Sequence, residues 1–247
     1  MNILQKTDIL GVKIDLVSRE QATKAILEKI EKEEKFWVVT PNPEFVVVAQ
    51  KDKEFKNILN KADLSLPDGF GLVLASRILG VKPLKERVSG ADIVGDLLDQ
   101  AAVRHWKIGI VGSRRGKKEE IKTLINKLQV LNNPYRVNKL QIEAQELTPD
   151  WERNKYDLIF ACQGMGKQER WIRENHKKID ASLFMGVGGS LDFYAGFVKR
   201  APEGIRQLGF EWAWRLTQEP AAHLKRVWIA VVIFMWLVIK KKIIQKN

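Results

Sequence analysis

Two kinds of apolar pattern alternate along most of the chain. Short continuous apolar segments suit buried strands, whereas apolar positions three and four residues apart suit helices packed on a core. Strands that alternate with helices favour a mostly parallel sheet with helices on both faces, so the sequence predicts an α/β fold. Strands are expected at 36–40, 64–67, 107–111, 157–161 and 181–187, with a weaker strand or hairpin arm at 9–16 and a doubtful strand at 135–140. Helices are expected at 18–33, 44–50, 52–61, after residue 71, and at 90–104, 117–129 and 168–178, with irregular chain at 143–154.

The turns after the strands carry the candidate chemistry. Each expected strand from residue 36 onward, except the doubtful one, ends in a turn rich in glycine or in Asn and Pro. The carboxyl ends of parallel strands share one edge of a sheet, where open α/β folds bind their ligands. Thr40 and Asn42 offer a hydroxyl and an amide for a ribose, phosphate or base edge. Asn42 stands between two prolines, which suits ordinary turn chemistry equally well.

Asp68 lies in the turn Leu66-Pro-Asp-Gly-Phe-Gly71, between a short apolar segment and an expected helix. Packing does not require an acid at a strand end, so this residue needs an explanation. One interpretation is a helix N-cap, because Asp accepts hydrogen bonds from the free N–H groups of a helix start. The other is a catalytic carboxylate that moves a proton. The local pattern leaves both open.

Further turns offer groups for a phosphate or a sugar. Arg87 could clamp a phosphate with its planar fork, or it is a solvated loop charge. The turn 112–116 is not a dinucleotide fingerprint, although a helix start there could receive a phosphate. Gln168 lies at the start of an expected helix. Helix formation does not require a glutamine there, so its presence is a mild indication of function. Three glycines allow either a close backbone approach to a ligand or simply a tight turn: Gly186, Gly188 and Gly189.

Several common site patterns are missing from the sequence. It has no Asp-x-Asp for a metal-bound diphosphate, no P-loop and no nucleophile elbow. The three histidines are scattered, so no zinc cluster is expected. A nucleotide diphosphate would then be neutralised by Arg and Lys, backbone N–H groups and helix dipoles. Cys162 is the single cysteine, which predicts a buried inert thiol and suits a reducing compartment.

Charge divides the chain near residue 199. The 247 residues carry a net charge of +12, and residues 198–247 hold ten basic and three acidic residues. Basic tails bind anionic lipid, nucleic acid or other polyanions. We expect an α/β core at 1–198 and a basic, Trp-rich helical appendage at 199–247. Residues 1–15 lack a basic region followed by an apolar core, so no signal peptide is expected.

The segment 227–239 has no charged residue and lies between Arg226 and three lysines. As a helix it would be roughly 20 Å long, which is short against a hydrocarbon core of about 30 Å. Trp228 and Trp236 suit the interface of a membrane. Partial membrane insertion is favoured over the alternative of a terminal core helix.

Six blocks stand out along the chain by their order and spacing. They are Thr40-Pro-Asn-Pro-Glu44, Leu66-Pro-Asp-Gly-Phe-Gly71, Glu86-Arg-Val-Ser-Gly90, Gly164-Met-Gly-Lys-Gln-Glu169, Gly186-Val-Gly-Gly189, and Arg200-Ala-Pro202 followed by Leu208-Gly-Phe-Glu-Trp212. Together they resemble the WecG/TagA/CpsF glycosyltransferase family. The resemblance covers about residues 9–226 and implies a Rossmann-like sheet. It also implies inverting transfer of a sugar from a UDP-sugar to undecaprenyl-diphosphate-linked N-acetylglucosamine at the cytoplasmic membrane face, without a metal.

The resemblance assigns roles by position. Asp68 matches the family's proposed general base, and Arg87 matches a basic residue near the diphosphate. Residues placed around the donor sugar or the acceptor are matched by Thr40, Asn42 and Gln168. Arginines of the C-terminal appendage complete the site at the membrane, and Arg215 and Arg226 occupy suitable places. Family members often carry an arginine just after Glu219-Pro220, where this chain has Ala221 and Ala222.

The donor is expected to be a neutral sugar, with N-acetylmannosamine as the best guess. UDP-glucose and a uronic acid donor are the alternatives within the family. A non-enzymatic, membrane-tethered polyanion or nucleic-acid binder is a second hypothesis, but the apolar C-terminal segment argues against nucleic acid. An epimerase is a third, and the missing dinucleotide fingerprint counts against it. A homo-oligomer is compatible with the sequence.

Overall fold

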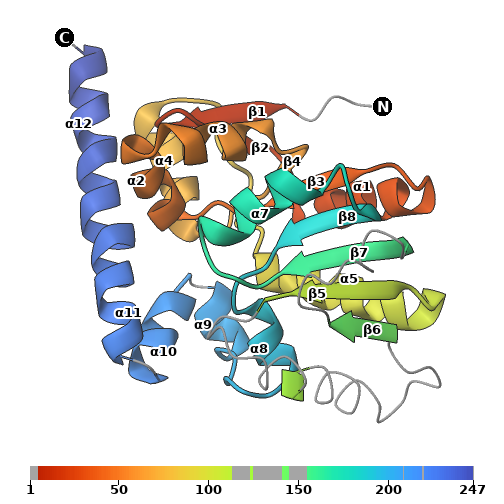
Figure 1. Ribbon diagram of the computed structural model, residues 1–247. Helices are drawn as coiled ribbons and strands as arrows, with labels where there is room; N and C mark the ends of the chain where they lie inside the picture. The colour runs from red at the N-terminus through yellow and green to blue at the C-terminus, as the bar shows by residue number, and fades with distance from the viewer. Residues whose placement is uncertain are drawn as a thin grey trace.

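A parallel sheet covered by helices on both faces forms the body of the protein (Figure 1). The computed structural model describes residues 5–112, 123–124, 141–144, 155–207, 209–218 and 220–246. Within them the sheet has six strands in the order β4-β3-β8-β7-β5-β6, all parallel. The expected α/β class is therefore confirmed. The strands are β3 (Phe36–Val39), β4 (Leu64–Ser65), β5 (Lys107–Val111), β6 (Gln141–Ala144), β7 (Lys155–Ala161) and β8 (Asp180–Gly186).

The two faces of the sheet bury two separate apolar clusters. Neighbouring residues of a strand point to opposite faces, so Phe36 and Val38 of β3 belong to one cluster and Trp37 and Val39 to the other. The first face is covered by α1 (Arg19–Glu31), α5 (Gly90–Arg104) and α8 (Ser190–Tyr194). The second is covered by α2 (Pro43–Lys51), α3 (Lys53–Lys61), α4 (Phe70–Leu79) and α7 (Lys167–Asn175).

Local sequence signals explain several element boundaries. The Ser18 side chain accepts a hydrogen bond from the Gln21 backbone N–H, and the Gln21 side chain accepts one from the Ser18 N–H, so the capping box at the start of α1 is present. Pro43 occupies the first turn of α2, where its missing N–H costs nothing. Strand β2 (Val12–Asp15) lies in the region 9–16 that was expected as a strand or hairpin arm. It pairs antiparallel with β1 (Lys6–Ile9), most of which precedes that region.

Part of the sixth strand was expected to be irregular chain. Residues 141–144 form β6, of which 143–144 were expected to be irregular, while the doubtful strand at 135–140 lies outside the described residues. Strand β6 is an edge strand that pairs only with β5 among the described residues. Strand β6 is recognised by its backbone pairing with β5. A short edge strand does not need a continuous apolar segment, which is the pattern used to predict the strands. The turn at 113–116 and most of the helix expected at 117–129 also lie outside the described residues.

A series of helices forms the C-terminal segment, defined here as residues 199–246. α11 (Pro220–Val227), the π-helical η2 (Trp228–Ile233) and α12 (Phe234–Lys246) follow one another as one long helix beside the body (Figure 1). Phe234 and Val238 are completely buried in the cluster that contains α2 and α4. Burial of each such side chain stabilises this arrangement by about 2 kcal/mol. The shorter helices before it are α9 (Glu203–Gln207) and α10 (Glu211–Gln218).

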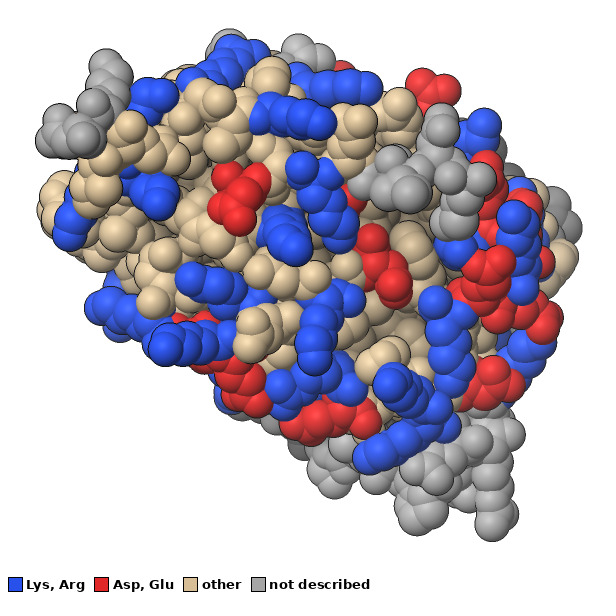
Figure 2. Space-filling view, turned by 90° about the horizontal axis from the view of Figure 1, so that it is seen from above, with Lys and Arg blue, Asp and Glu red and all other residues tan. Residues whose placement is uncertain are grey.

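The other side of the long helix exposes an apolar stripe. Trp228 and Trp236 are more than half exposed. In Figure 2, uncharged and basic side chains dominate the side on which α12 lies, while acidic and basic side chains mix on the opposite side. Among the described helices, none combines the length and the apolar character that crossing a membrane requires. The other exposed apolar residues of the stripe are Val231, Val232, Ile239, Ile243 and Ile244.

Candidate active site

Adjacent strands β3 and β8 send the chain to opposite faces of the sheet. After β3 the chain enters α2 on one face, and after β8 it enters α8 on the other. Such a switch point leaves a crevice outside the carboxyl ends of the strands. The turns meet there as expected, because the Thr40 hydroxyl donates a hydrogen bond to the carbonyl of Gly186 at 3.5 Å. The candidate site is therefore at this edge.

Asp68 follows β4 at the same edge, and its carboxylate faces a helix start. That helix is not the one that follows it, because Gly69 is the N-cap of α4 and makes no side-chain cap bond. Asp68 Oδ2 instead accepts a hydrogen bond of 3.1 Å from the N–H of Gly90, the first residue of α5. The expected cap of the following helix is thus wrong. The positive end of the α5 dipole still favours the ionised carboxylate.

Gly90 has no room for a side chain. A Cβ atom there would lie 2.9 Å from the Thr40 Cγ2 atom and 3.3 Å from Asp68 Oδ2. The start of α5 therefore packs directly onto Thr40 and Asp68. This close approach places a hydroxyl and a carboxylate from two different strand ends beside one helix N-terminus.

Arg87 stands between two carboxylates. Its Nη2 atom lies 2.7 Å from Glu211 Oε2 and 3.4 Å from Asp68 Oδ1. Burial raises the pKa of the Asp68 carboxyl above its ordinary value, while the Arg87 charge and the Gly90 N–H oppose that rise. Burial would also raise the pKa of Glu211, but its hydrogen bond and charge interaction with Arg87 bring that pKa below the ordinary value. The pKa values of the two carboxyls are thus shifted in opposite directions.

A cavity of about 400 Å³ opens in front of Asp68. The turns after β3 and β4 line one side of it, and α10, α11 and η2 line the other. Five residues predicted for the site line it: Asn42, Asp68, Arg87, Arg215 and Arg226. The Asn42 side chain accepts a hydrogen bond from the Phe45 N–H, so it is also the N-cap of α2. Both interpretations of Asn42 are therefore compatible with its position.

The two arginines of the C-terminal segment are held by the core. Arg226 Nε lies 2.8 Å from Glu44 Oε2, and Glu44 is buried at the start of α2. The Arg215 guanidinium lies 4.4 Å from the centre of the Phe193 ring. A planar cation stacks well on an aromatic face. Together with Arg87, these arginines give the cavity three cations that could bind a diphosphate.

Gln168 and the glycine turn form a second cluster beside the cavity. Gln168 Oε1 accepts a hydrogen bond of 3.0 Å from the Gly188 N–H, and a Cβ at Gly186 would lie 2.6 Å from Gln168 Nε2. These glycines therefore approach the Gln168 amide closely. Gly189 precedes α8 as its N-cap. None of Thr40, Gln168 and the three glycines lines the cavity. Thr40 bonds to the Gly186 carbonyl of this cluster and, like Asp68, lies against Gly90.

Three buried acids of the site were missed in the sequence. Glu44, Glu169 and Glu211 are each at most 7% exposed, and all lie in blocks that carry the family resemblance. Glu169 Oε1 accepts a hydrogen bond of 2.6 Å from Gln168 Nε2. Burial raises the pKa of Glu169 to about 7. An acid inside an apolar and aromatic block, as in Leu208-Gly-Phe-Glu-Trp212, is the sequence signal that could have identified Glu211.

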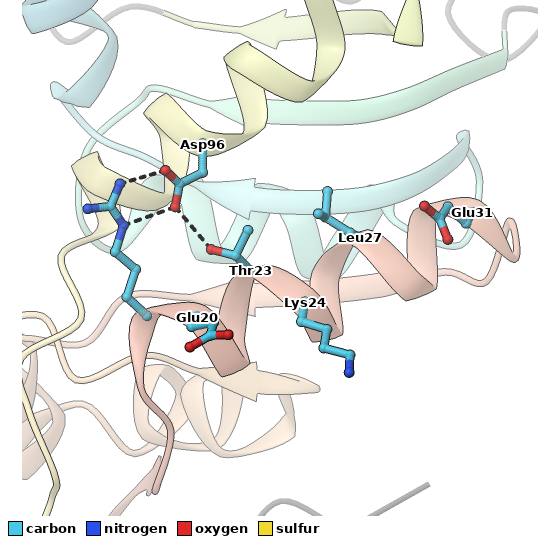
Figure 3. Close-up of a pocket in the computed structure, with 7 residues that line it drawn as sticks. Glu20, Thr23, Lys24, Leu27, Glu31 and Asp96 are labelled. Atoms are coloured by element: carbon cyan, nitrogen blue, oxygen red, sulfur yellow. Dashed lines mark hydrogen bonds and ion pairs between the residues drawn. The ribbon is translucent and has the colours of Figure 1, made fainter. Parts of the chain in front are cut away.

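A second hollow, of about 500 Å³, lies between α1 and α5 (Figure 3). Asp96 of α5 accepts hydrogen bonds there from Arg19 and Thr23 of α1. No strand-end residue lines this hollow, so it is not part of the candidate site. Among the described residues, no three His, Cys, Asp or Glu side chains group as metal ligands.

The fold and the cavity define an α/β enzyme with a carboxylate and three arginines at the carboxyl edge of its sheet. The chain belongs to the WecG/TagA/CpsF family of glycosyl transferases, whose family model matches residues 7–247. It is therefore a glycosyltransferase.

Two Staphylococcus aureus proteins are similar over nearly the whole chain. Both are called N-acetylglucosaminyldiphosphoundecaprenol N-acetyl-beta-D-mannosaminyltransferase. The protein of strain MRSA252 is 31% identical over 242 residues, which cover 96% of this chain and 93% of the relative. The protein of strain NCTC 8325 / PS 47 is 30% identical with the same coverage.

Proposed function

We propose that this enzyme transfers N-acetylmannosamine from UDP-N-acetylmannosamine to undecaprenyl-diphosphate-linked N-acetylglucosamine, with inversion and without a metal. The observation that carries the proposal is the single cavity in which Asp68 faces three arginines. The names of the two relatives support the acceptor and the transferred sugar. With the three arginines assigned to the diphosphate, the described lining of the cavity offers no further Lys or Arg for the carboxylate of a uronic acid, which favours a neutral donor sugar.

Asp68 is the proposed general base. Its carboxylate takes the proton from the acceptor hydroxyl while that oxygen attacks the anomeric carbon. The bond from the anomeric carbon to the UDP oxygen breaks at the same time, and its electron pair leaves with UDP. A single displacement from the opposite face inverts the anomeric centre. The raised pKa of Asp68 makes it a stronger base, provided that the pH keeps it ionised.

The departing UDP gains negative charge, which the arginines are placed to stabilise. Arg87 enters the cavity from the core, and Arg215 and Arg226 enter it from the C-terminal segment. Arg215 and Arg226 lie on either side of Ala221 and Ala222 in the sequence, where family members often have an arginine. We infer that these two residues supply the cations at that side of the cavity.

The cavity also has an apolar wall that suits a lipid-linked acceptor. Leu74 of α4 and Val231 and Met235 of the long helix line it. The exposed apolar stripe of the long helix continues beyond this wall. With the diphosphate at the arginines and the isoprenoid along this wall, the acceptor sugar would reach Asp68. This placement supports an enzyme that works at the cytoplasmic face of a membrane, partly inserted through its exposed stripe.

A transfer assay tests the proposal. UDP-N-acetylmannosamine is incubated with a short-chain lipid-diphosphate N-acetylglucosamine, and the product is identified by mass spectrometry. Proton NMR of the new glycosidic bond should show an inverted anomeric centre, and EDTA should leave the rate unchanged. Faster transfer from UDP-glucose or from the uronic acid donor would reject N-acetylmannosamine as the sugar. Loss of activity with EDTA that Mg²⁺ restores would reject the metal-free mechanism.

A further inference from the structure

Glu211 reaches from the C-terminal segment into the centre of the site. It is the first residue of α10 and is only 6% exposed. A buried charge costs several kcal/mol unless it is well paired. Glu211 has no role in the transfer as proposed above, so its place beside the base needs an explanation.

Glu211 and Asp68 share one nitrogen atom of Arg87. The Nη2 atom is 0.7 Å closer to Glu211 than to Asp68, at 2.7 Å against 3.4 Å. A charge-assisted hydrogen bond has its full strength at about 2.8 Å and weakens with distance. Arg87 therefore pairs mainly with Glu211 and only loosely with Asp68.

Arg200 holds Glu211 from its other side. Arg200 Nε lies 3.6 Å from Glu211 Oε1, and Arg200 Nη2 lies 2.6 Å from Asp92 of α5. Arg206 also pairs with Asp92, at 3.4 Å. This chain of ion pairs connects the C-terminal segment to α5, the helix whose first N–H binds Asp68. The position of Glu211 thus depends on how the C-terminal segment packs on the core.

We propose that Glu211 is a positioning residue that draws Arg87 away from Asp68 and so keeps Asp68 basic enough to accept a proton. Without Glu211, Arg87 would turn toward the nearest carboxylate, which is Asp68. An opposite charge at close range lowers the pKa of a carboxyl by 1–3 units, and the resulting carboxylate is a weaker base. Because Glu211 belongs to α10, the C-terminal segment contributes to the strength of the base. This inference rests on the proposed function of Asp68.

The charged groups that act on Asp68 come from three elements. Arg87 and the Gly90 N–H lower its pKa from the core side, and Arg215 lowers it from α10. Glu211 acts in the opposite direction, because its negative charge raises the pKa of Asp68. Removal of Glu211 would therefore lower the pKa of Asp68 in two ways. It would take away a nearby negative charge, and it would leave Arg87 free to pair with Asp68.

The test is the pH dependence of transfer by Glu211→Gln, an isosteric change without the charge. We expect the acid limb of kcat/KM to move about one pH unit lower, and kcat on the plateau to fall about 10-fold. Glu211→Asp should lie between this variant and the wild type. Asp96→Asn is the matched control, because it removes the carboxylate that pairs with Arg19 and does not line the cavity, and it should leave the profile unchanged.

A titration of Asp68 in the free protein separates this inference from the proposed function. Carbon NMR of ¹³C-labelled carboxyls, with the Asp68 signal assigned by its loss in Asp68→Asn, should show the lower pKa in Glu211→Gln even if no sugar is transferred. The double variant Glu211→Gln with Arg87→Gln should raise that pKa again, and it replaces the single variant if that one does not fold. An Asp68 pKa that stays the same in every folded variant would overturn the inference. A lower rate with an unmoved acid limb would do the same.

Discussion

The two sides of the cavity are built in different ways. On the core side, Thr40 and Asp68 are fixed by hydrogen bonds to backbone groups of the last residue of β8 and the first residue of α5. On the C-terminal side, Glu44 and Arg226 meet across 182 residues of sequence, and Glu211 meets Arg87 across 124. Sheet geometry therefore fixes the proposed base, whereas helix docking places two of the three arginines, Arg215 and Arg226. Substitutions on the core side should slow the chemical step most. Substitutions on the C-terminal side should weaken binding of the diphosphate and of the lipid.

The largest effect is expected from Asp68→Asn. The amide oxygen can still accept the Gly90 N–H bond, so the fold should remain while the proton acceptor is lost. We expect kcat to fall by about 10³-fold in the transfer assay. Asp63→Asn is the control, because Asp63 also accepts a backbone N–H bond, from Trp37, without lining the cavity. Full activity of Asp68→Asn would remove this residue from its role and would leave the core side without a base.

The second-largest effect is expected from Glu169 and concerns stability. Burial raises the pKa of this residue from an ordinary 4.5 to about 7. The folded protein holds this proton at pH values where the unfolded chain has released it. The free energy of unfolding should therefore fall as the pH rises from about 4.5 to 7, by about 3 kcal/mol from this group. Urea unfolding of Glu169→Gln at several pH values should lack this part of the slope. A slope identical to that of the wild type would show that Glu169 is ionised in the fold.

Arg226→Ala sharpens the comparison from the C-terminal side. We expect kcat/KM to fall about 10-fold because one cation at the diphosphate is lost. Stability should fall by about 1 kcal/mol because Glu44 stays buried without this partner. Adding Glu44→Gln should restore the melting temperature but not the rate. If the double variant regained its activity, the role of Arg226 would be structural only.

The smallest effect is expected at the exposed stripe. Trp228→Gln with Trp236→Gln removes two aromatic rings that lie outside the core. Pelleting with anionic liposomes should weaken several-fold, while transfer to a detergent-soluble short-chain acceptor stays the same. Val103→Gln is the control, since Val103 is exposed on α5 away from the stripe. This test is cleaner than deletion of the segment from residue 227, which would also uncover the surface that Phe234 and Val238 bury. Unchanged pelleting would contradict the membrane assignment.

The sequence predicted the sheet and its site edge because both follow from local patterns. Apolar segments that end in polar turns were sufficient to bring Asn42 and Asp68 to one cavity. Arg87 lies in the loop between α4 and α5, and only the family resemblance assigned it to the site. The pairs of Glu44 with Arg226 and of Glu211 with Arg87 were missed, because the periodicity of a sequence says nothing about contacts between residues so far apart. Glu169 was missed because an acid in the first turn of an amphipathic helix normally faces solvent. The division at residue 199 and the roles of the predicted site residues stay predictions.

The docking of α12 has a consequence for the size of the acceptor. Phe234 and Val238 pack the long helix onto α2 and α4, so the helix is docked on the same body that carries Asp68. If the exposed stripe rests in the membrane surface, this docking holds Asp68 at a constant height above the lipid. A first sugar attached directly to the diphosphate would end at that height, and a longer glycan would extend past it. The enzyme would then accept only a lipid-linked sugar whose hydroxyl lies at that height, and transfer would stop after one sugar is added.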